Sequence, residues 1–206
     1  MMNFNFRLKI YIGVAIFLIV SFFFKDSQPV KELPEIGNVP QFEFTNSDGN
    51  IVTLDNLKGK VWVADFIFTT CTMACPMMTG NMNIVHKKFK NNDNVRLVSI
   101  SVYPEYDTPE VLKNYASQYD ADTEKWLFLT GKEDAVKDII RDGFKIGDYE
   151  DIIFHSEKFA LVDKKGIIRA YYNGMKSEDM KQLKKDIDVL LKPVSYTHLR
   201  AHETLR

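Results

Sequence analysis

The distribution of apolar residues along the chain predicts buried strands that alternate with helices. Residues 61–68 (VWVADFIF) and 95–102 (VRLVSISV) are nearly continuous apolar runs of strand length, which is typical of strands covered on both faces. Residues 177–192 carry apolar side chains at helical spacing instead. The face that these side chains form consists of Met180, Leu183, Ile187 and Leu190. This alternation predicts an α/β domain with parallel strand pairs.

Turn and cap residues indicate where the other elements begin and end. Asn, Ser, Asp and Gly gather at 46–50 between two short β-prone runs, and Asp107-Thr108-Pro109-Glu110 is a helix-start pattern. The expected elements are, in chain order, a hairpin at 42–53, a helix at 76–89, a helix from about 107, a strand at 126–129, a helix at 133–141, and strands at 159–162 and 167–172. Together they predict a central mixed sheet flanked by helices, with an N-terminal hairpin extension.

The start of the chain is an apolar segment rather than part of the domain. Residues 8–24 read LKIYIGVAIFLIVSFFF, with Arg7 and Lys9 at the front edge. This length is at the short end of the roughly 17–25 residues that span a bilayer. Phe and Lys follow the apolar run, where a cleaved signal peptide needs small residues, so the sequence favours an uncleaved membrane anchor at 1–24.

Three further segments follow from composition. Residues 25–40 contain three prolines among polar residues and read as a tether. Residues 41–192 form the expected domain, a length that buries a core without crosslinks. Residues 193–206 continue no pattern and resemble translated vector sequence, so we expect a non-native or disordered tail.

Overall charge excludes one class of partner. The 206 residues include 27 basic and 28 acidic side chains, and the formal net charge is −1. The basic residues form no stripe along the chain, as a nucleic-acid-binding surface would require. We therefore expect no nucleic-acid partner.

Both cysteines of the chain lie in one short stretch, FTTCTMACPMM at residues 68–78. Cys71 and Cys75 stand where the first core strand is expected to end and the next helix to begin. Helix N-termini favour thiolates, and ligand sites in α/β sheets collect at the carboxyl ends of strands. On a helical turn, the i, i+4 spacing would place both sulfurs on one side.

The residues alone leave four interpretations of this pair open. Two small buried hydrophobes or a structural disulfide would be inert, and such a disulfide would close too short a loop to stabilise the fold much. A redox-active pair and a metal site are the chemical alternatives. Zinc prefers four ligands, and the chain has no second cysteine pair, whereas Cu(I) is soft and is served by few thiolate or imidazole ligands.

Two histidines are candidates for a third ligand. His86 falls on the expected helix roughly 16 Å along its axis from Cys75, so we interpret it as a surface histidine. His155 lies just before an expected strand, in a loop that can reach the sheet edge where the cysteines stand. Helix packing or a soft-ligand surface for copper explains four nearby methionines, Met73, Met77, Met78 and Met82.

Four segments of the chain form a recognisable combination. They are the strand 61–68 followed by Thr70-Cys71-Thr72-Met73-Ala74-Cys75-Pro76, the strand 98–102, Asp107-Thr108-Pro109 before a helix, and Phe154-His155-Ser156 before a strand that ends in Asp163. Together they resemble the Sco/SenC family of copper-binding assembly factors for cytochrome oxidase. They occur in the family's order, and the resemblance covers about residues 8–192. The CxxxCP motif with a downstream His-Ser is specific, whereas CxxxC alone is not.

The resemblance implies a thioredoxin-like fold and a copper site. Carried over to this chain, the copper ligands for Cu(I) or Cu(II) are Cys71, Cys75 and His155. One departure concerns Tyr103-Pro104, where the family commonly has Asp-Pro, so an acidic group expected near the site is missing.

The resemblance also implies a function. The leading hypothesis is a copper metallochaperone, tethered to the cytoplasmic membrane through residues 8–24, with its domain on the periplasmic or other extracytoplasmic side. It would deliver copper to the copper site of cytochrome c oxidase or to another copper protein. The alternatives are a thiol–disulfide oxidoreductase that keeps partner cysteines reduced, which would make the protein an enzyme, and a copper or redox sensor.

Overall fold

The computed structural model describes residues 32–147 and 157–192. Its strands are β1 (Gly37–Asn38), β2 (Glu43–Asn46), β3 (Ile51–Thr53), β4 (Val61–Ile67), β5 (Val95–Ser101), β6 (Trp126–Thr130), β7 (Lys158–Val162) and β8 (Ile167–Asn173). Its helices are α2 (Leu54–Leu57), α3 (Ala74–Phe89), α4 (Pro109–Ser117), α5 (Glu133–Asp138), the π-helical segment η1 (Ile139–Phe144) and α7 (Ser177–Leu191). The strands and helices predicted from the sequence are all present, with ends shifted by a few residues.

All eight strands belong to one mixed sheet with the order β1-β8-β7-β4-β5-β6-β2-β3. The central strands β4, β5 and β6 are parallel to one another, whereas the other neighbouring strands pair antiparallel. The β4–β5 register runs without a break from Val61 opposite Val95 to Ile67 opposite Ser101. The two strands therefore end side by side, and the segments that follow them leave the sheet at the same edge.

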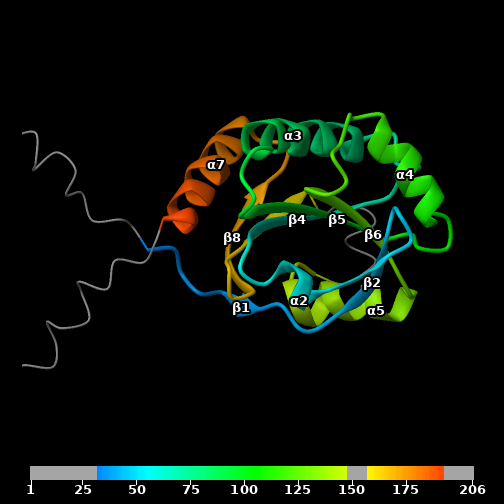
Figure 1. Cartoon of the computed structure of the whole chain (residues 1–206), viewed down its shortest axis with the longest axis horizontal. Coiled ribbons are helices and arrows are strands. Elements are labelled where there is room, and N and C mark those ends of the chain that lie inside the picture. The colour runs from blue at the N-terminus through cyan, green and yellow to red at the C-terminus, as the bar shows by residue number, and fades with distance from the viewer. Residues whose placement is uncertain (1–31, 148–156, 193–206) are drawn as a thin grey trace, which may run out of the picture. The chain divides into compact units, whose positions relative to one another are not determined.

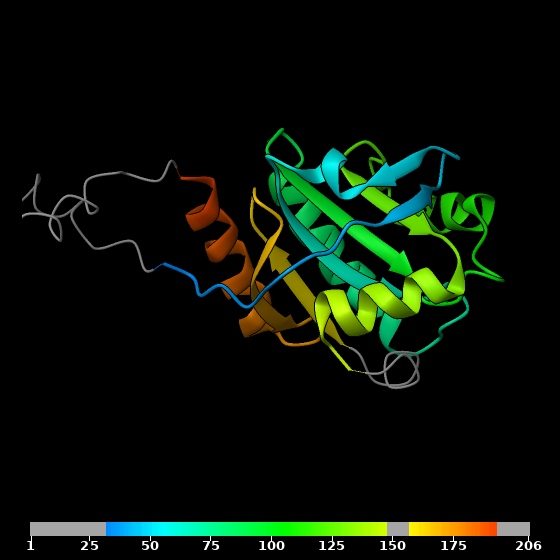
Figure 2. The same cartoon turned by 90° about the horizontal axis from the view of Figure 1, so that it is seen from below.

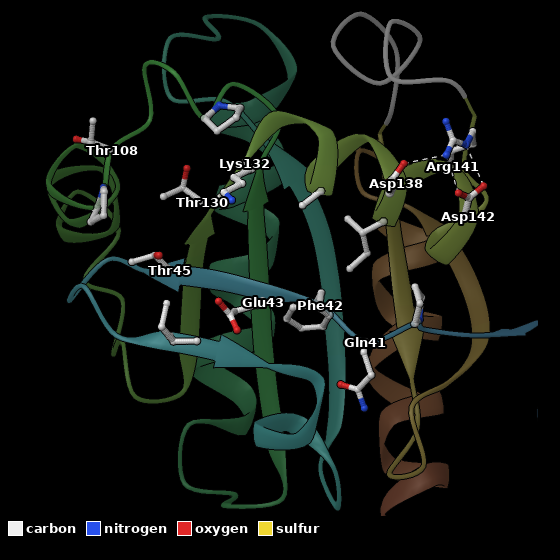
Figure 3. Close-up of a pocket in the computed structure, with 17 residues that line it drawn as sticks. Gln41, Phe42, Glu43, Thr45, Thr108, Thr130, Lys132, Asp138, Arg141 and Asp142 are labelled. Carbon is white, nitrogen blue, oxygen red and sulfur yellow. Dashed lines mark hydrogen bonds and ion pairs between the residues drawn. The ribbon is translucent and has the colours of Figure 1, made fainter.

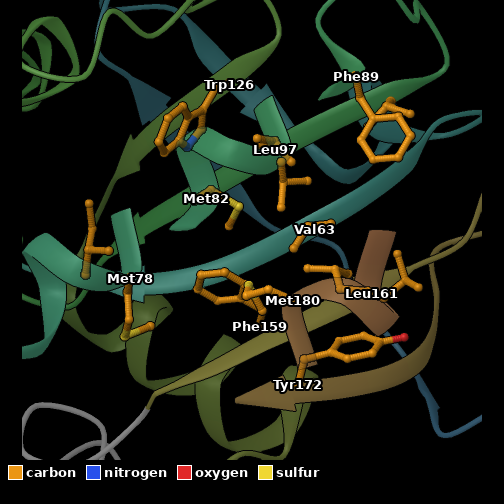
Figure 4. Packing of buried hydrophobic residues seen from close by; sticks show 14 of the residues in the cluster. Val63, Met78, Met82, Phe89, Leu97, Trp126, Phe159, Leu161, Tyr172 and Met180 are labelled. Atoms are coloured by element: carbon orange, nitrogen blue, oxygen red, sulfur yellow. The ribbon is translucent and has the colours of Figure 1, made fainter. Parts of the chain in front are cut away.

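Helices cover both faces of the sheet (Figures 1 and 2). One apolar cluster joins the sheet to α3, α4 and α7, and a second joins the other face to α2, α5 and η1. The first cluster contains Met78, Met82, Trp126, Phe159 and Met180, whose side chains meet between α3, α7 and the strands (Figure 4). Burial of this apolar surface, at roughly 25 cal/mol per Å², holds α3 against the sheet.

The start of α3 differs from the predicted one. The helix begins at Ala74, two residues before Pro76, so Cys75 lies inside its first turn. Cys71 precedes the helix, so the two cysteines do not share a helical turn. Pro76 is tolerated because the N–H groups of the first turn have no partner within a helix.

His86 is also placed differently from the prediction. It is 6% exposed rather than on the surface, and its ring lies 5.6 Å from that of Trp126. The helical spacing is the reason, because 86 falls on the same face as the buried residues 75, 78, 79, 82, 85 and 89. Within the described part of the chain, neither ring nitrogen has a hydrogen-bond partner.

The last residues of the predicted tether are part of the sheet. Gly37 and Asn38 form β1, which pairs with β8, and Val39 is buried. The guanidinium of Arg169 also donates to the carbonyl oxygens of Leu33 and Pro34. Residues 33–39, which the sequence analysis assigned to the tether, therefore pack with the sheet.

The predicted membrane anchor and tail lie outside the described residues. Among the helices of 32–147 and 157–192, none has the length and apolar character needed to cross a membrane. Residues 8–24 and 193–206 fall beyond these ranges, so their predicted roles stay predictions.

One acidic residue lies within the central strand β4. Asp65 is 0% exposed, and its Oδ1 accepts a hydrogen bond of 2.6 Å from the hydroxyl of Ser99. The same hydroxyl accepts a bond of 2.9 Å from Nε1 of Trp126, whereas Oδ2 of Asp65 has no partner among the described residues. Burial raises the pKa of the Asp65 carboxyl to about 7, because removal from water disfavours the charged form.

The raised pKa of Asp65 predicts how stability depends on pH. The folded state holds this proton up to about pH 7, whereas the unfolded chain loses it near pH 4. The contribution of Asp65 to stability therefore falls as pH rises from about 4 to about 7 and is constant above. We expect Asp65→Asn to have a higher free energy of unfolding than wild type at pH 8, by up to about 4 kcal/mol, because Asn carries no charge. Its urea midpoint should be higher accordingly.

The measurement is urea unfolding of both proteins between pH 4 and pH 8. The advantage of Asp65→Asn should shrink steadily as pH falls and disappear near pH 4. Ser99→Ala is the control, since it removes a hydrogen bond to Asp65 and leaves the carboxyl in place. An advantage of equal size at pH 4 and pH 8 would contradict the assignment to a buried charge.

Candidate metal centre

The two cysteines lie beyond the carboxyl end of β4. After Ile67 the chain makes a turn in which the N–H of Cys71 donates to the carbonyl oxygen of Phe68, at 3.2 Å. Cys71 is partly exposed and packs against the α3 side of the core, whereas Cys75 is buried in the first turn of α3. Cys71 thus comes from a loop and Cys75 from a helix.

The two side chains nevertheless meet. Both cysteines are free thiols, and each lies close enough to affect the ionisation of the other: Cys75 helps to lower the pKa of Cys71, and Cys71 helps to raise the pKa of Cys75. The two thiols are therefore neighbours across the junction between the loop and the helix. Two neighbouring sulfurs can share a soft metal ion or form a disulfide.

The start of α3 gives Cys71 an unusual environment. Burial by itself would raise the pKa of the Cys71 thiol, but the backbone N–H groups of Cys75, Met73 and Ala74 and the side chain of Cys75 together lower it below its ordinary value. These N–H groups belong to the beginning of the helix and have no acceptor within it. Cys71 is therefore the sulfur that ionises more readily, as expected at a helix N-terminus.

Cys75 has the opposite character. Burial raises the pKa of its thiol to about 12, against a smaller lowering by the backbone N–H of Phe68. The neighbouring Cys71 and the negative charge of Asp65 raise this pKa further. Ionisation of Cys75 therefore needs a cation or a covalent partner to replace the proton.

The four nearby methionines separate into two pairs. Met78 and Met82 are 1% and 0% exposed, so helix packing accounts for them. Met73 and Met77 are 81% and 53% exposed and lie beside the cysteines, where packing gives no reason for them. The soft-ligand interpretation stays open for this second pair alone.

A buried carboxylate adjoins the turn that carries Cys71. Asp107 is 0% exposed and accepts hydrogen bonds from Thr69 and from Ser101. The sequence analysis used Asp107 only as part of a helix start, and Thr108 does cap α4 by accepting a bond from the N–H of Val111. The signal that was missed is that Asp107 and the end of β4 face the same sheet edge.

Tyr103, the departure from the family pattern, lies on the surface of the neighbouring loop. It is 44% exposed, and its ring stacks on that of Tyr106 at a centroid distance of 6.0 Å and an interplanar angle of 8°. An aromatic pair thus occupies the part of the loop where the family commonly has an acidic group.

The third predicted ligand, His155, lies outside the described residues. Within 32–147 and 157–192, no three His, Cys, Asp or Glu side chains form a group that can hold a metal ion. The structure brings Cys71 and Cys75 together, and the place of His155 in the site stays a prediction.

A separate cavity lies on the other side of the sheet from the α3 core. It has a volume of about 890 Å³ and is lined by β2 residues, by the start of α4 and by α5 and η1, with an ion-paired cluster of Asp138, Arg141 and Asp142 at one end (Figure 3). Among the described residues, no cysteine, histidine or methionine lines this cavity. Neither Cys71 nor Cys75 belongs to its lining.

Comparison with known proteins identifies the relatives of this chain. The SCO1/SenC family model matches residues 32–192. The SCO1 protein homolog of Bacillus subtilis is 39% identical over 155 residues, which cover 72% of this chain and 80% of the relative.

Solved structures agree with this match. BsSco, described as a member of the Sco family of cytochrome c oxidase assembly proteins with a disulfide switch, superposes with a TM-score of 0.69 at 36% identity and covers 79% of this chain and 100% of its own. ScoI of Bradyrhizobium japonicum, solved with copper bound, gives a TM-score of 0.62 at 28% identity over 76% of this chain and 99% of its own. The predicted mixed α/β, thioredoxin-like Sco fold is confirmed by these matches and by the sheet order. This chain belongs to the SCO1/SenC family.

Proposed function

We propose that this protein is a copper metallochaperone that carries one copper ion on Cys71, Cys75 and His155. The observation that carries the proposal is that two free thiols are neighbours at the open edge of the sheet. The start of α3 lowers the pKa of one of them, Cys71, and so favours its thiolate. A solved relative that contains copper supports the same assignment.

The donor set fits copper better than zinc. Two thiolates are soft ligands, which Cu(I) prefers, and Cu(I) accepts two or three ligands. Zinc would need two more protein ligands to complete a closed site, and the described residues offer none beside the cysteines. The environment of Cys75 points the same way, because a bound cation would replace the proton that burial otherwise retains.

His155 is proposed as the third ligand on the basis of chain continuity. Ala160 pairs with Ala64 in antiparallel register, so β7 begins beside the carboxyl end of β4. Glu157, the residue before β7, is two residues from His155, and two residues span at most about 7 Å. This closeness in sequence to the start of β7 supports His155 as the third ligand.

Delivery would proceed by exchange of ligands. Cys71 is partly exposed and Cys75 buried, so an incoming thiolate or imidazole of an acceptor would displace Cys71 before Cys75. A disulfide sulfur is a poor ligand, so oxidation of the pair would prevent copper binding. The acceptor that we propose is the copper site of cytochrome c oxidase, because a close relative belongs to a family of oxidase assembly proteins.

We further propose that residues 8–24 anchor the protein in the cytoplasmic membrane, with the domain on the extracytoplasmic side. The length and composition of this segment support the anchor, and Arg7 and Lys9 support a cytoplasmic start. Residues 25–32 would then form the tether, since the domain begins near residue 33.

A thiol–disulfide oxidoreductase is the second candidate function. The asymmetry of the two thiols favours it, because an accessible sulfur of lowered pKa attacks a partner's disulfide and a buried second sulfur resolves the mixed disulfide. This function needs both cysteines but has no use for His155.

The first prediction concerns copper stoichiometry. We expect the reduced protein, loaded with Cu(I) without oxygen and then desalted, to retain one copper per chain. His155→Ala should weaken binding by roughly tenfold or more because it removes a ligand. Cys71→Ser/Cys75→Ser should abolish retention. The measurement is metal content together with competition against a chromophoric Cu(I) chelator.

His198→Ala is the matched control, since this histidine belongs to the tail predicted to be non-native. It should bind copper as wild type does. Copper retained by the double cysteine variant would refute the site. Two results together would favour the oxidoreductase. The reduced wild type would retain no copper, and wild type and His155→Ala would reduce a disulfide substrate at the same rate.

The second prediction concerns the order in which the thiols react. Cys71 has a lowered pKa and is partly exposed, whereas the pKa of Cys75 is about 12. In the reduced, metal-free protein at pH 7.5, iodoacetamide should therefore modify Cys71 at least about tenfold faster than Cys75, because only thiolates react.

The measurement is mass spectrometry of peptides after timed alkylation, from pH 6 to pH 9. Cys71→Ser provides the comparison, because its remaining thiol, Cys75, should still be alkylated slowly at pH 9. Equal rates for the two cysteines in wild type would contradict the assigned asymmetry.

A further inference from the structure

The buried carboxylate of Asp107 links the ends of the two central strands. Its oxygens accept hydrogen bonds from the backbone N–H of Thr69, at 3.3 and 3.2 Å, and from the hydroxyl of Thr69. A further oxygen contact is the 2.6 Å bond donated by the hydroxyl of Ser101. Thr69 follows β4 and Ser101 ends β5, so one side chain joins both exits from the sheet.

These donors satisfy Asp107 without a cation. None of the ion pairs among the described residues involves Asp107. Its carboxylate is 0% exposed, so the hydroxyl and N–H groups provide the stabilisation that water would otherwise give. Loss of this acceptor would leave the N–H and hydroxyl of Thr69 and the hydroxyl of Ser101 without their partner.

Asp107 is itself held in place by its own loop. Its N–H donates to the carbonyl oxygen of Tyr103 at 2.9 Å, and the N–H of Tyr103 donates to the hydroxyl of Ser101 at 3.0 Å. The N–H of Val102 donates to the carbonyl oxygen of Ile67, which extends the β4–β5 ladder up to this loop. The carboxylate is thus part of the rigid end of the sheet.

The bonded partner, Thr69, belongs to the turn that presents Cys71. This turn runs from Phe68 to Cys71 and is closed by the backbone bond between these two residues. Within this turn, the N–H of Thr69 donates to the carboxylate of Asp107. Asp107 thereby fixes the position of the turn. Cys75 is placed independently, by the packing of α3 against the core.

We propose that Asp107 is the positioning residue of the copper site, because it holds the Cys71 turn where the two sulfurs meet. The proposal rests on the proposed copper function for its consequence, and its geometric part concerns the sulfurs alone. Asp107 does not contact the metal; it acts through Thr69. Residues that orient ligands in this way commonly change metal affinity about 10–100-fold when they are replaced.

The test compares Asp107→Asn with Asp163→Asn in the full chain. Asp163 is another buried carboxylate, 7% exposed, that accepts bonds from the N–H groups of Lys165 and Ile167 and, unlike Asp107, also pairs with Arg169 at 2.8 Å. Val162 pairs with Trp62, so Asp163 lies at the opposite end of β4 from the cysteines. Both variants remove a buried carboxylate that organises a loop, and only one of them adjoins the Cys71 turn.

Two properties are measured for each variant. The first is the affinity for Cu(I), by competition with a chromophoric chelator, and the second is the equilibrium of the Cys71–Cys75 disulfide with glutathione. We expect Asp107→Asn to bind Cu(I) at least about tenfold more weakly. We also expect its disulfide equilibrium to move toward the dithiol by roughly threefold or more, because a released Cys71 meets Cys75 less often. Asp163→Asn should leave both values as in wild type.

Urea unfolding of both variants separates a positioning effect from a general loss of stability. If Asp163→Asn loses a comparable free energy of unfolding, its Cu(I) affinity and disulfide equilibrium should still match those of wild type. Thr69→Val is the second variant, in case Asp107→Asn does not fold. It removes only the hydroxyl bond and should shift both values in the same direction by less.

The outcomes distinguish this proposal from the copper function. Unchanged Cu(I) affinity in Asp107→Asn would overturn the positioning role, whatever the disulfide does. Equal changes in Asp163→Asn would also overturn it, because the effect would then be general. If wild type binds no copper, the copper function fails, and the disulfide equilibrium alone decides whether Asp107 places the sulfurs.

Discussion

The parallel pairing of β4 with β5 is the constraint on which the rest of the site depends. Their unbroken register places the carboxyl ends side by side, so the two connections that follow must start from one edge of the sheet. One connection contains Cys71 and Cys75, and the other contains Asp107. An antiparallel pair would have sent these segments to opposite edges, and a carboxylate from one could not have bonded Thr69 in the other.

The asymmetry of the two thiols follows from where α3 begins. A start at Ala74 leaves Cys71 facing the unpaired N–H groups of the first turn and places Cys75 on the face that packs against the core. Had the helix begun at Pro76, as the proline suggested, Cys75 would have preceded it. The sheet-facing spacing from 75 to 89 extends the helix back to Ala74, because burial of this face outweighs the preference of proline for the first position.

Much of the fold could be predicted because each central element has a periodicity of its own. The runs at 61–68 and 95–102 are apolar enough to be strands buried on both faces, and they are β4 and β5. The elements that were missed are short and depend on tertiary partners. β1 consists of two residues that pair with β8, and the four-residue α2 follows β3 directly. In the site, adjacency in sequence revealed the cysteine pair, whereas Asp107 is 38 residues from Thr69 and no local pattern connects them.

The proposed copper and redox functions would use two states of the same pair of sulfurs rather than two independent sites. Each cysteine sulfur has the same electrons available for donation to a metal ion or for a bond to its neighbour, so copper binding and disulfide formation exclude each other. The placement that brings the sulfurs into contact favours both states, and the Asp107 link therefore cannot choose between them. The differences in burial and pKa between the two sulfurs would instead decide which state forms. Buried Cys75 would retain its proton until a metal ion or Cys71 replaces it, and partly exposed Cys71 would meet an incoming partner first.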